Sequence, residues 1–132
     1  MAYWKEPKKK PNCTPKEEEE QKALINYCNY MASKYSGLDL IYAIPNGGSR
    51  NSIEARNLKL TGVKAGVPDL FLPVARKGKH GLYIEMKRRE GGRLSNNQKW
   101  WLEKLSKQGY ETAVCKGLDE AISVIELYYS DE

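Results

Sequence analysis

The chain has 132 residues, which is enough for one domain with a modest hydrophobic core but hardly for two. Its 22 basic and 17 acidic residues give a net charge of +5, a bias that suits a polyanionic partner. Three cysteines without metal-type spacing argue against a disulfide framework or a zinc site. We find neither a signal peptide nor an apolar run long enough to span a membrane. We therefore expect a soluble intracellular protein.

The first half of the chain predicts a tail followed by helices and a strand. Lysine and proline dominate residues 1–14, which we interpret as a basic tail ahead of a single domain over 15–132. Apolar residues at helical intervals predict a helix over 15–35. A strand over 38–44 and a helix over 51–60 follow.

Two apolar runs joined by a polar, glycine-rich connector predict a β-hairpin. The runs cover 69–74 and 81–87, and the connector covers 77–81. A bend near the start of the connector brings Asp69 opposite the neighbourhood of Glu85. Two carboxylates that are distant in sequence therefore converge.

The last third of the chain predicts a helix over 95–108, a strand over 111–115 and a closing helix over 118–129. The complete order is αβαββαβα. Such alternation favours an α/β fold with a central mixed sheet flanked by helices, in which the last strand is reached through a helical crossover.

The predicted hairpin carries residues that can cut a phosphodiester bond. Glu85 and Lys87 share one face of their strand because side chains alternate across a sheet, and Asp69 joins them. Carboxylate oxygens are the ligands that Mg²⁺ prefers, and Mn²⁺ is the alternative ion. Lys87 could orient the attacking water, stabilise the phosphate or take a proton, and the sequence leaves these roles open. Glu-x-Lys by itself is more often the polar face of a half-exposed strand.

A longer pattern favours the catalytic interpretation. Pro68-Asp69, followed at hairpin distance by Glu85-Met86-Lys87, matches the PD-(D/E)xK nuclease superfamily. Within it, the chain resembles the virus-type replication-repair nuclease (VRR-NUC) family, in the short stand-alone form typical of phage proteins. The shared stretches are Tyr-Ala-Ile-Pro-Asn-Gly-Gly (42–48), Gly-Val-Lys-Ala-Gly-Val-Pro-Asp-Leu-Phe-Leu-Pro (62–73) and Gly-Leu-Tyr-Ile-Glu-Met-Lys (81–87).

The resemblance implies a restriction-endonuclease-like core and a set of site residues. Asp69 and Glu85 are then metal ligands, the carbonyl of Met86 adds another, and Lys87 is the catalytic lysine. A glutamate of the first helix completes the acidic set. If the protein is phage-encoded, it acts in the cytoplasm of the host cell.

Four consecutive glutamates compete for that last position. Extending the apolar stripe of the helix backwards reaches Glu17 by one row and Glu20 by the neighbouring row, whereas Glu18 and Glu19 point elsewhere. Glu17 is therefore the first choice and Glu20 the second. The alternative is that all four favour the helix N-terminus through its dipole and remain in water.

Further residues are candidates for contacts with the substrate. The loop after the first predicted strand lets backbone amides approach a phosphate, although an ordinary turn is the alternative, and the resemblance places this loop beside the site. Arginines behind the catalytic strand are expected to hold phosphates, and related nucleases often use a glutamine on the next helix. The predicted contacts are Asn46, Gly47, Gly48, Arg50, Arg88, Arg89, Arg93 and Gln98.

These observations predict a Mg²⁺- or Mn²⁺-dependent DNA endonuclease that selects branched, junction or flap DNA by shape in replication, repair or recombination. A single catalytic centre in a small chain favours a homodimer for cutting both strands of a Holliday junction, with the last helix, near Tyr128 and Tyr129, as a candidate interface. The alternatives are a nucleic-acid-binding module that does not cleave, or a subunit that targets a partner enzyme to DNA. The intact acids and lysine speak against both.

Overall fold

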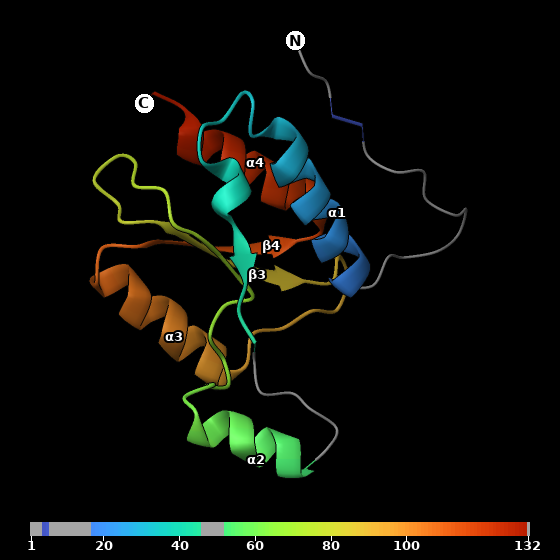
Figure 1. Ribbon diagram of the computed structural model, residues 1–132, viewed down its shortest axis with the longest axis vertical. Coiled ribbons are helices and arrows are strands. Elements are labelled where there is room, and N and C mark those ends of the chain that lie inside the picture. The colour runs from blue at the N-terminus through green and yellow to red at the C-terminus, as the bar shows by residue number, and fades with distance from the viewer. Residues whose placement is uncertain (1–3, 6–16, 46–51, 132) are drawn as a thin grey trace.

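The computed structural model describes residues 4–5, 17–45 and 52–131 (Figure 1). Helices and strands in this part of the chain follow the predicted order, with a short 3-10 helix added before the first strand. The elements are α1 (Glu17–Met31), η1 (Leu38–Leu40), β1 (Tyr42–Ala43), α2 (Ser52–Leu60), β2 (Leu70–Leu72), β3 (Leu82–Lys87), α3 (Asn96–Lys107), β4 (Glu111–Lys116) and α4 (Leu118–Tyr129).

The sheet is mixed, as predicted. Its strand order is β1-β2-β3-β4, with antiparallel pairing from β1 to β3 and parallel pairing between β3 and β4. A parallel pair needs a crossover, and α3 supplies it. Figure 1 shows α1 and α4 on one side of the sheet and α3 on the other, while α2 lies apart from the other helices. The α/β architecture inferred from the element order is confirmed.

The hydrophobic core fills the space between the sheet and the α1–α4 pair. Alternate residues of β2 and β3 point into it, and a helical stripe of α1 meets them. The intervening residues of the strands face the side that carries α3. Fully buried apolar side chains of this core are Leu24, Cys28, Leu38, Leu70, Leu72, Leu82, Ile84, Met86, Cys115, Ala121 and Ile125.

The boundaries of α1 differ from the prediction at its C-terminal end. The helix ends at Met31 rather than at residue 35, and the backbone turns as the amides of Lys34 and Tyr35 both bond to the carbonyl of Met31. Tyr35 then packs on Tyr129 of α4, with ring centroids 5.0 Å apart. Tertiary contact with another helix therefore replaces the last predicted turn.

The strand predicted over 38–44 is wrong for its first half. Leu38–Leu40 forms a 3-10 helix, and only Tyr42–Ala43 pairs with β2. The amide of Leu40 bonds to the carbonyl of Gly37, whose φ of 85° suits glycine and starts the tight turn. An apolar-polar-apolar triplet fits a strand, but it also fits one 3-10 turn, and the glycine decides in favour of the turn.

The hairpin between β2 and β3 turns where the sequence predicted. Arg76 and Lys79 exchange both backbone hydrogen bonds, at 3.1 and 2.8 Å. The two residues between them, Lys77 and Gly78, have φ values of 51° and 77°. Positive φ at both central positions is what a type I′ turn requires, and its twist matches that of the strands.

The edges of the fold are less buried than the core. Three apolar residues of α3, Trp101, Leu102 and Leu105, are half-buried, because α3 covers the sheet near its β4 edge. Trp4, in the predicted tail, packs edge-on against Tyr27 of α1, with ring centroids 5.2 Å apart.

None of the helices in the described ranges combines the length and the apolar character needed to cross a membrane.

Candidate active site

The register of the β2–β3 hairpin places Asp69 beside Glu85. Leu70 pairs with Ile84, so the residues one step outward from this pair, Asp69 and Glu85, are neighbours on the same face of the sheet. The backbone N–H of Met86 donates to Asp69 Oδ2 at 2.7 Å. This hydrogen bond holds the Asp69 carboxylate against β3.

Glu85 is surrounded by donors and is removed from water. It is 2% exposed, and its Oε2 accepts a hydrogen bond from Gln98 Nε2 at 3.2 Å and lies 3.5 Å from Lys87 Nζ. Its other oxygen, Oε1, is buried and accepts no hydrogen bond from the residues described. A buried carboxylate oxygen without a partner is costly, and a metal ion is one group that satisfies it.

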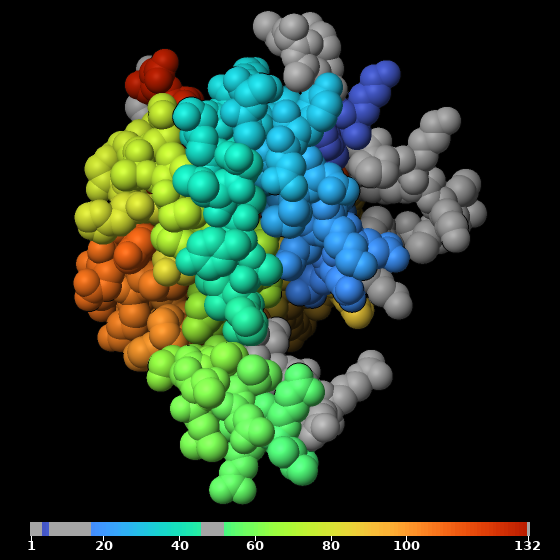
Figure 2. All heavy atoms as spheres, viewed as in Figure 1, coloured from blue at the N-terminus to red at the C-terminus, as the bar shows by residue number. Residues whose placement is uncertain are grey.

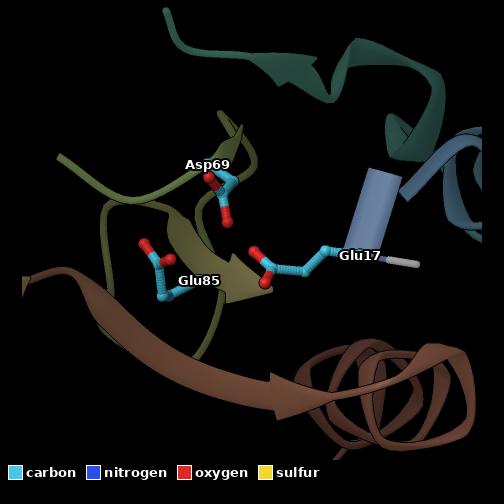
Figure 3. Close-up of side chains that lie close together, drawn as sticks. All are labelled: Glu17, Asp69 and Glu85. Carbon is cyan, nitrogen blue, oxygen red and sulfur yellow. The ribbon is translucent and has the colours of Figure 1, made fainter. Parts of the chain in front are cut away.

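A third carboxylate reaches the same place from α1. One oxygen from each of Glu17, Asp69 and Glu85 lies within 4.8 Å of the others. Figure 3 shows the three side chains pointing toward one another from the start of α1, the start of β2 and the middle of β3. Three elements that are far apart in sequence thus supply the cluster.

The electrostatics of the cluster favour a cation. Burial first, and then the charge of the neighbouring Asp69, raise the pKa of Glu85 from 4.5 to about 8, although Lys87 acts in the opposite direction. One ammonium group therefore does not offset the negative charge assembled here. Carboxylate oxygens are ligands that hard divalent ions prefer, so this cluster could hold such an ion.

Gln98 is held in place by the start of α3. Ser95 is the N-cap of this helix, and its hydroxyl accepts the backbone N–H of Gln98 at 3.1 Å. The side-chain carbonyl of Gln98 accepts the backbone N–H of Ser95 at 2.9 Å, which completes a capping box. With its oxygen used in this way, the amide of Gln98 presents its NH₂ group to Glu85.

Glu20 occupies a different position from Glu17. Its Oε1 accepts hydrogen bonds from Arg89 Nε at 2.6 Å and from the backbone N–H of Leu118 at 3.3 Å. The group of convergent carboxylates found in the described residues includes Glu17 and not Glu20. Glu18 is exposed and pairs with Lys22.

The predicted substrate contacts lie in several environments. Arg88 and Arg93 are exposed behind β3, whereas Arg89 is partly buried by its pairing with Glu20. Residues 46–51, which contain the predicted contacts Asn46, Gly47, Gly48 and Arg50, lie outside the described residues.

The sequence did not single out Lys116. The parallel register pairs it with Lys87, so the two side chains leave the same face of the sheet, and Lys116 is exposed. Nothing in its local sequence marks it, because its proximity to the site depends on the pairing of β4 with β3. A second lysine therefore lies next to Lys87 on the neighbouring strand.

Comparisons with known proteins agree with this geometry. The model of the VRR-NUC domain matches residues 5–119. A solved structure described as a VRR_NUC domain protein is 35% identical, with a TM-score of 0.74 over 88% of this chain and 89% of that one. A comparison with curated proteins gave no match. Because the domain match spans most of the chain, and because the solved structure is matched over most of both chains, the chain belongs to the VRR-NUC family of nuclease domains.

Proposed function

We propose that this protein is a Mg²⁺- or Mn²⁺-dependent endonuclease that hydrolyses phosphodiester bonds in DNA. The observation that carries the proposal is the convergence of Glu17, Asp69 and Glu85, with Lys87 Nζ 3.5 Å from Glu85. A structural salt bridge would need one acid for one base. Three convergent carboxylates, of which only Glu85 pairs with a lysine, instead fit a site for a divalent ion.

The three carboxylates would hold the ion, and the carbonyl of Met86 would be a further ligand. A bound Mg²⁺ supplies Lewis acidity, which makes water a better nucleophile and offsets charge on the phosphate. The protein holds these ligands in place: the amide of Met86 fixes Asp69, and Gln98 fixes Glu85. Preorganised ligands of this kind avoid a reorganisation cost during the reaction.

Lys87 acts as a cation next to the scissile phosphate. Its side chain is only 11% exposed, and its ammonium is directed along the face that carries Glu85. A partly desolvated ammonium stabilises the negative charge that develops on the phosphate more strongly than a solvated one does. We assign Lys87 this electrostatic role.

The substrate is DNA selected by its shape. Exposed basic side chains at and after the ends of β3 and β4, Arg88, Arg93 and Lys116, would bind phosphates in a salt-sensitive way, and phosphate contacts carry no sequence information. Branched, junction and flap DNA present phosphates from several strands to one such surface. We therefore propose branched DNA as the preferred class.

We also propose that the protein acts as a homodimer on four-way junctions. Tyr128 and Tyr129 are buried within the chain and donate their hydroxyls to the carbonyls of Val74 and Ser36, so these two residues do not form the interface. Figure 2 shows α2 projecting from the body, and its Ile53 and Leu60 are 71% and 76% exposed. Exposed apolar residues on a projecting helix support contact with a second copy through α2.

The test is a cleavage assay on linear, flapped and four-way DNA of identical sequence, with Mg²⁺, Mn²⁺ or EDTA. We expect metal-dependent cutting of the branched substrates and loss of turnover by at least about a hundredfold in Glu85→Gln and Asp69→Asn, with DNA binding retained. Failure of the wild type to cut any substrate with either metal would remove the proposal and favour a module that only binds DNA. Light scattering that gives a monomer mass with and without DNA would remove the dimer.

A further inference from the structure

The start of α4 lacks a cap of its own. Its N-cap residue is Gly117, which has a φ of 91° and no side chain to bond the free amides of the first turn. The carboxylate of Glu20 replaces that cap from another helix, because Oε1 accepts the N–H of Leu118 at 3.3 Å. A carboxylate at a helix N-terminus is also favoured by the helix dipole.

The same carboxylate holds the segment that follows the catalytic strand. Arg89 Nε donates to Glu20 Oε1 at 2.6 Å, and the side chain of Glu20 is only 3% exposed. The backbone N–H of Gly117 donates to the carbonyl of Lys87 at 3.2 Å. Glu20, Arg89, Gly117 and Leu118, hereafter the Glu20 cluster, thus join α1, the end of β3 and the start of α4.

The cluster has no room for a side chain at position 117. A Cβ there would lie 2.8 Å from Cγ and Nε of Arg89 and 3.1 Å from Oε2 of Glu20. Glycine is therefore required both by the positive φ and by the approach of the ion pair. The absence of a side chain at position 117 leaves room for Glu20 and Arg89 to pair, which indicates that the position of this ion pair is important.

The cluster lies one helical turn from the candidate metal site. Glu17 precedes Glu20 by three residues in the first turn of α1, so both leave neighbouring parts of the same helix face. The first turn of a helix lacks half of its hydrogen bonds and frays readily. Arg89, the partner of Glu20, lies only two residues after Lys87 in the segment that follows β3.

We infer that Glu20 and Arg89 are positioning residues, which set the distance between Glu17 and the pair formed by Glu85 and Lys87. The inference rests on the proposed function, because it assigns the cluster to the metal site. Arg89 then serves α1 rather than the DNA, and the contacts with phosphates fall to the exposed arginines. Pairing the two residues also avoids leaving either charge buried alone.

The experiment compares Glu20→Gln with Glu18→Gln in the full chain. Both changes remove one charge from the first turn of α1, but Glu18 is exposed and lies outside the cluster. Glutamine at position 20 keeps an acceptor for the amide of Leu118 and loses the ion pair. Mn²⁺ affinity is measured by calorimetry well below the unfolding temperature, and kcat and KM are measured on the substrate that the wild type cuts best.

We expect Glu20→Gln to weaken Mn²⁺ binding by about tenfold and to lower kcat, while the KM for DNA stays within about twofold of wild type. Arg89→Ala should have the same effects, and the double variant should be no worse than either single one, because the two residues act as a unit. Arg89→Lys, which keeps the charge, should recover part of the affinity. Glu18→Gln should behave as wild type.

Three outcomes would overturn the inference. Lower thermal stability with wild-type Mn²⁺ affinity and kcat in Glu20→Gln and Arg89→Ala would make the cluster purely structural. A higher KM and a weaker salt dependence in Arg89→Ala, with unchanged Mn²⁺ affinity, would make Arg89 a phosphate contact. A wild type that neither binds Mn²⁺ nor cuts DNA would remove the proposed function, and the positioning role with it.

Discussion

The burial of Glu85 makes a specific prediction for the stability of the metal-free protein. On folding, the pKa of this carboxyl rises from 4.5 to about 8. Between these two values the folded chain holds a proton that the unfolded chain releases. The free energy of unfolding therefore falls as the pH rises, whereas a carboxylate with a lowered pKa would have the opposite effect.

The magnitude follows from the width of that pH range. Each pH unit between the two pKa values contributes at most about 1.4 kcal/mol. Because Glu85 interacts with Asp69 and Lys87, its titration is broader than that of an isolated carboxyl, so the total is smaller than this maximum. We expect this one group to lower the free energy of unfolding by roughly 2–4 kcal/mol between pH 5 and pH 8. The stabilising contribution is complete below pH 4.5 and is lost as the pH passes 8.

The assay is urea unfolding in EDTA across this pH range for the wild type and for Glu85→Gln. Glutamine has the same shape and does not titrate, so the difference between the two profiles reports the titration of Glu85 together with its interactions with Asp69 and Lys87. The wild type should lose stability relative to the variant as the pH rises, and added Mg²⁺ should restore it at pH 8. Parallel profiles would refute the reasoning, because they would mean that Glu85 ionises as readily in the folded chain as in the unfolded one.

Three further predictions concern residues that hold the site or the fold in place. Ser95→Ala should lower the free energy of unfolding, measured in urea, by about 1 kcal/mol. It should also reduce kcat in a kinetic assay, because Gln98 loses half of its capping box. Gly66→Ala should destabilise by at least about 2 kcal/mol in the same unfolding assay, since position 66 has a φ of 92° and its Cβ would lie 2.9 Å from the backbone carbon of Asn97. Arg76→Ala should cost about 1–2 kcal/mol and increase hydrogen exchange at the end of α4, because Arg76 donates to the carbonyls of its last two residues, and an unchanged exchange rate would contradict this capping role.

Local patterns predicted those parts of the fold whose turns are chemically specific. The bend at Lys77 and Gly78 was located because a polar, glycine-rich connector separates two apolar runs, and the structure has positive φ at both residues. That bend determined the hairpin register, and the register brought Asp69 to Glu85. Ser95 was recognised as the start of α3 for a similar reason, since its hydroxyl caps the helix.

Boundaries that depend on distant contacts were predicted less well. The last predicted turn of α1 is replaced by packing of Tyr35 on Tyr129. The first half of the predicted strand over 38–44 is a 3-10 turn, since its apolar spacing fits both structures. These differences arise because short apolar segments take the conformation that their tertiary neighbours allow.

The amino-acid sequence alone determined the family, because Pro68-Asp69, Glu85-Met86-Lys87 and the longer stretches around them can be recognised before the chain folds. Only the tertiary structure separated Glu17 from Glu20. The two occupy the same turn of one helix. Glu17 meets Asp69 and Glu85, whereas Glu20 meets Arg89 and Leu118. These neighbours come from parts of the chain that meet only after folding. Helical periodicity specifies which way a side chain points, but long-range packing specifies what it meets.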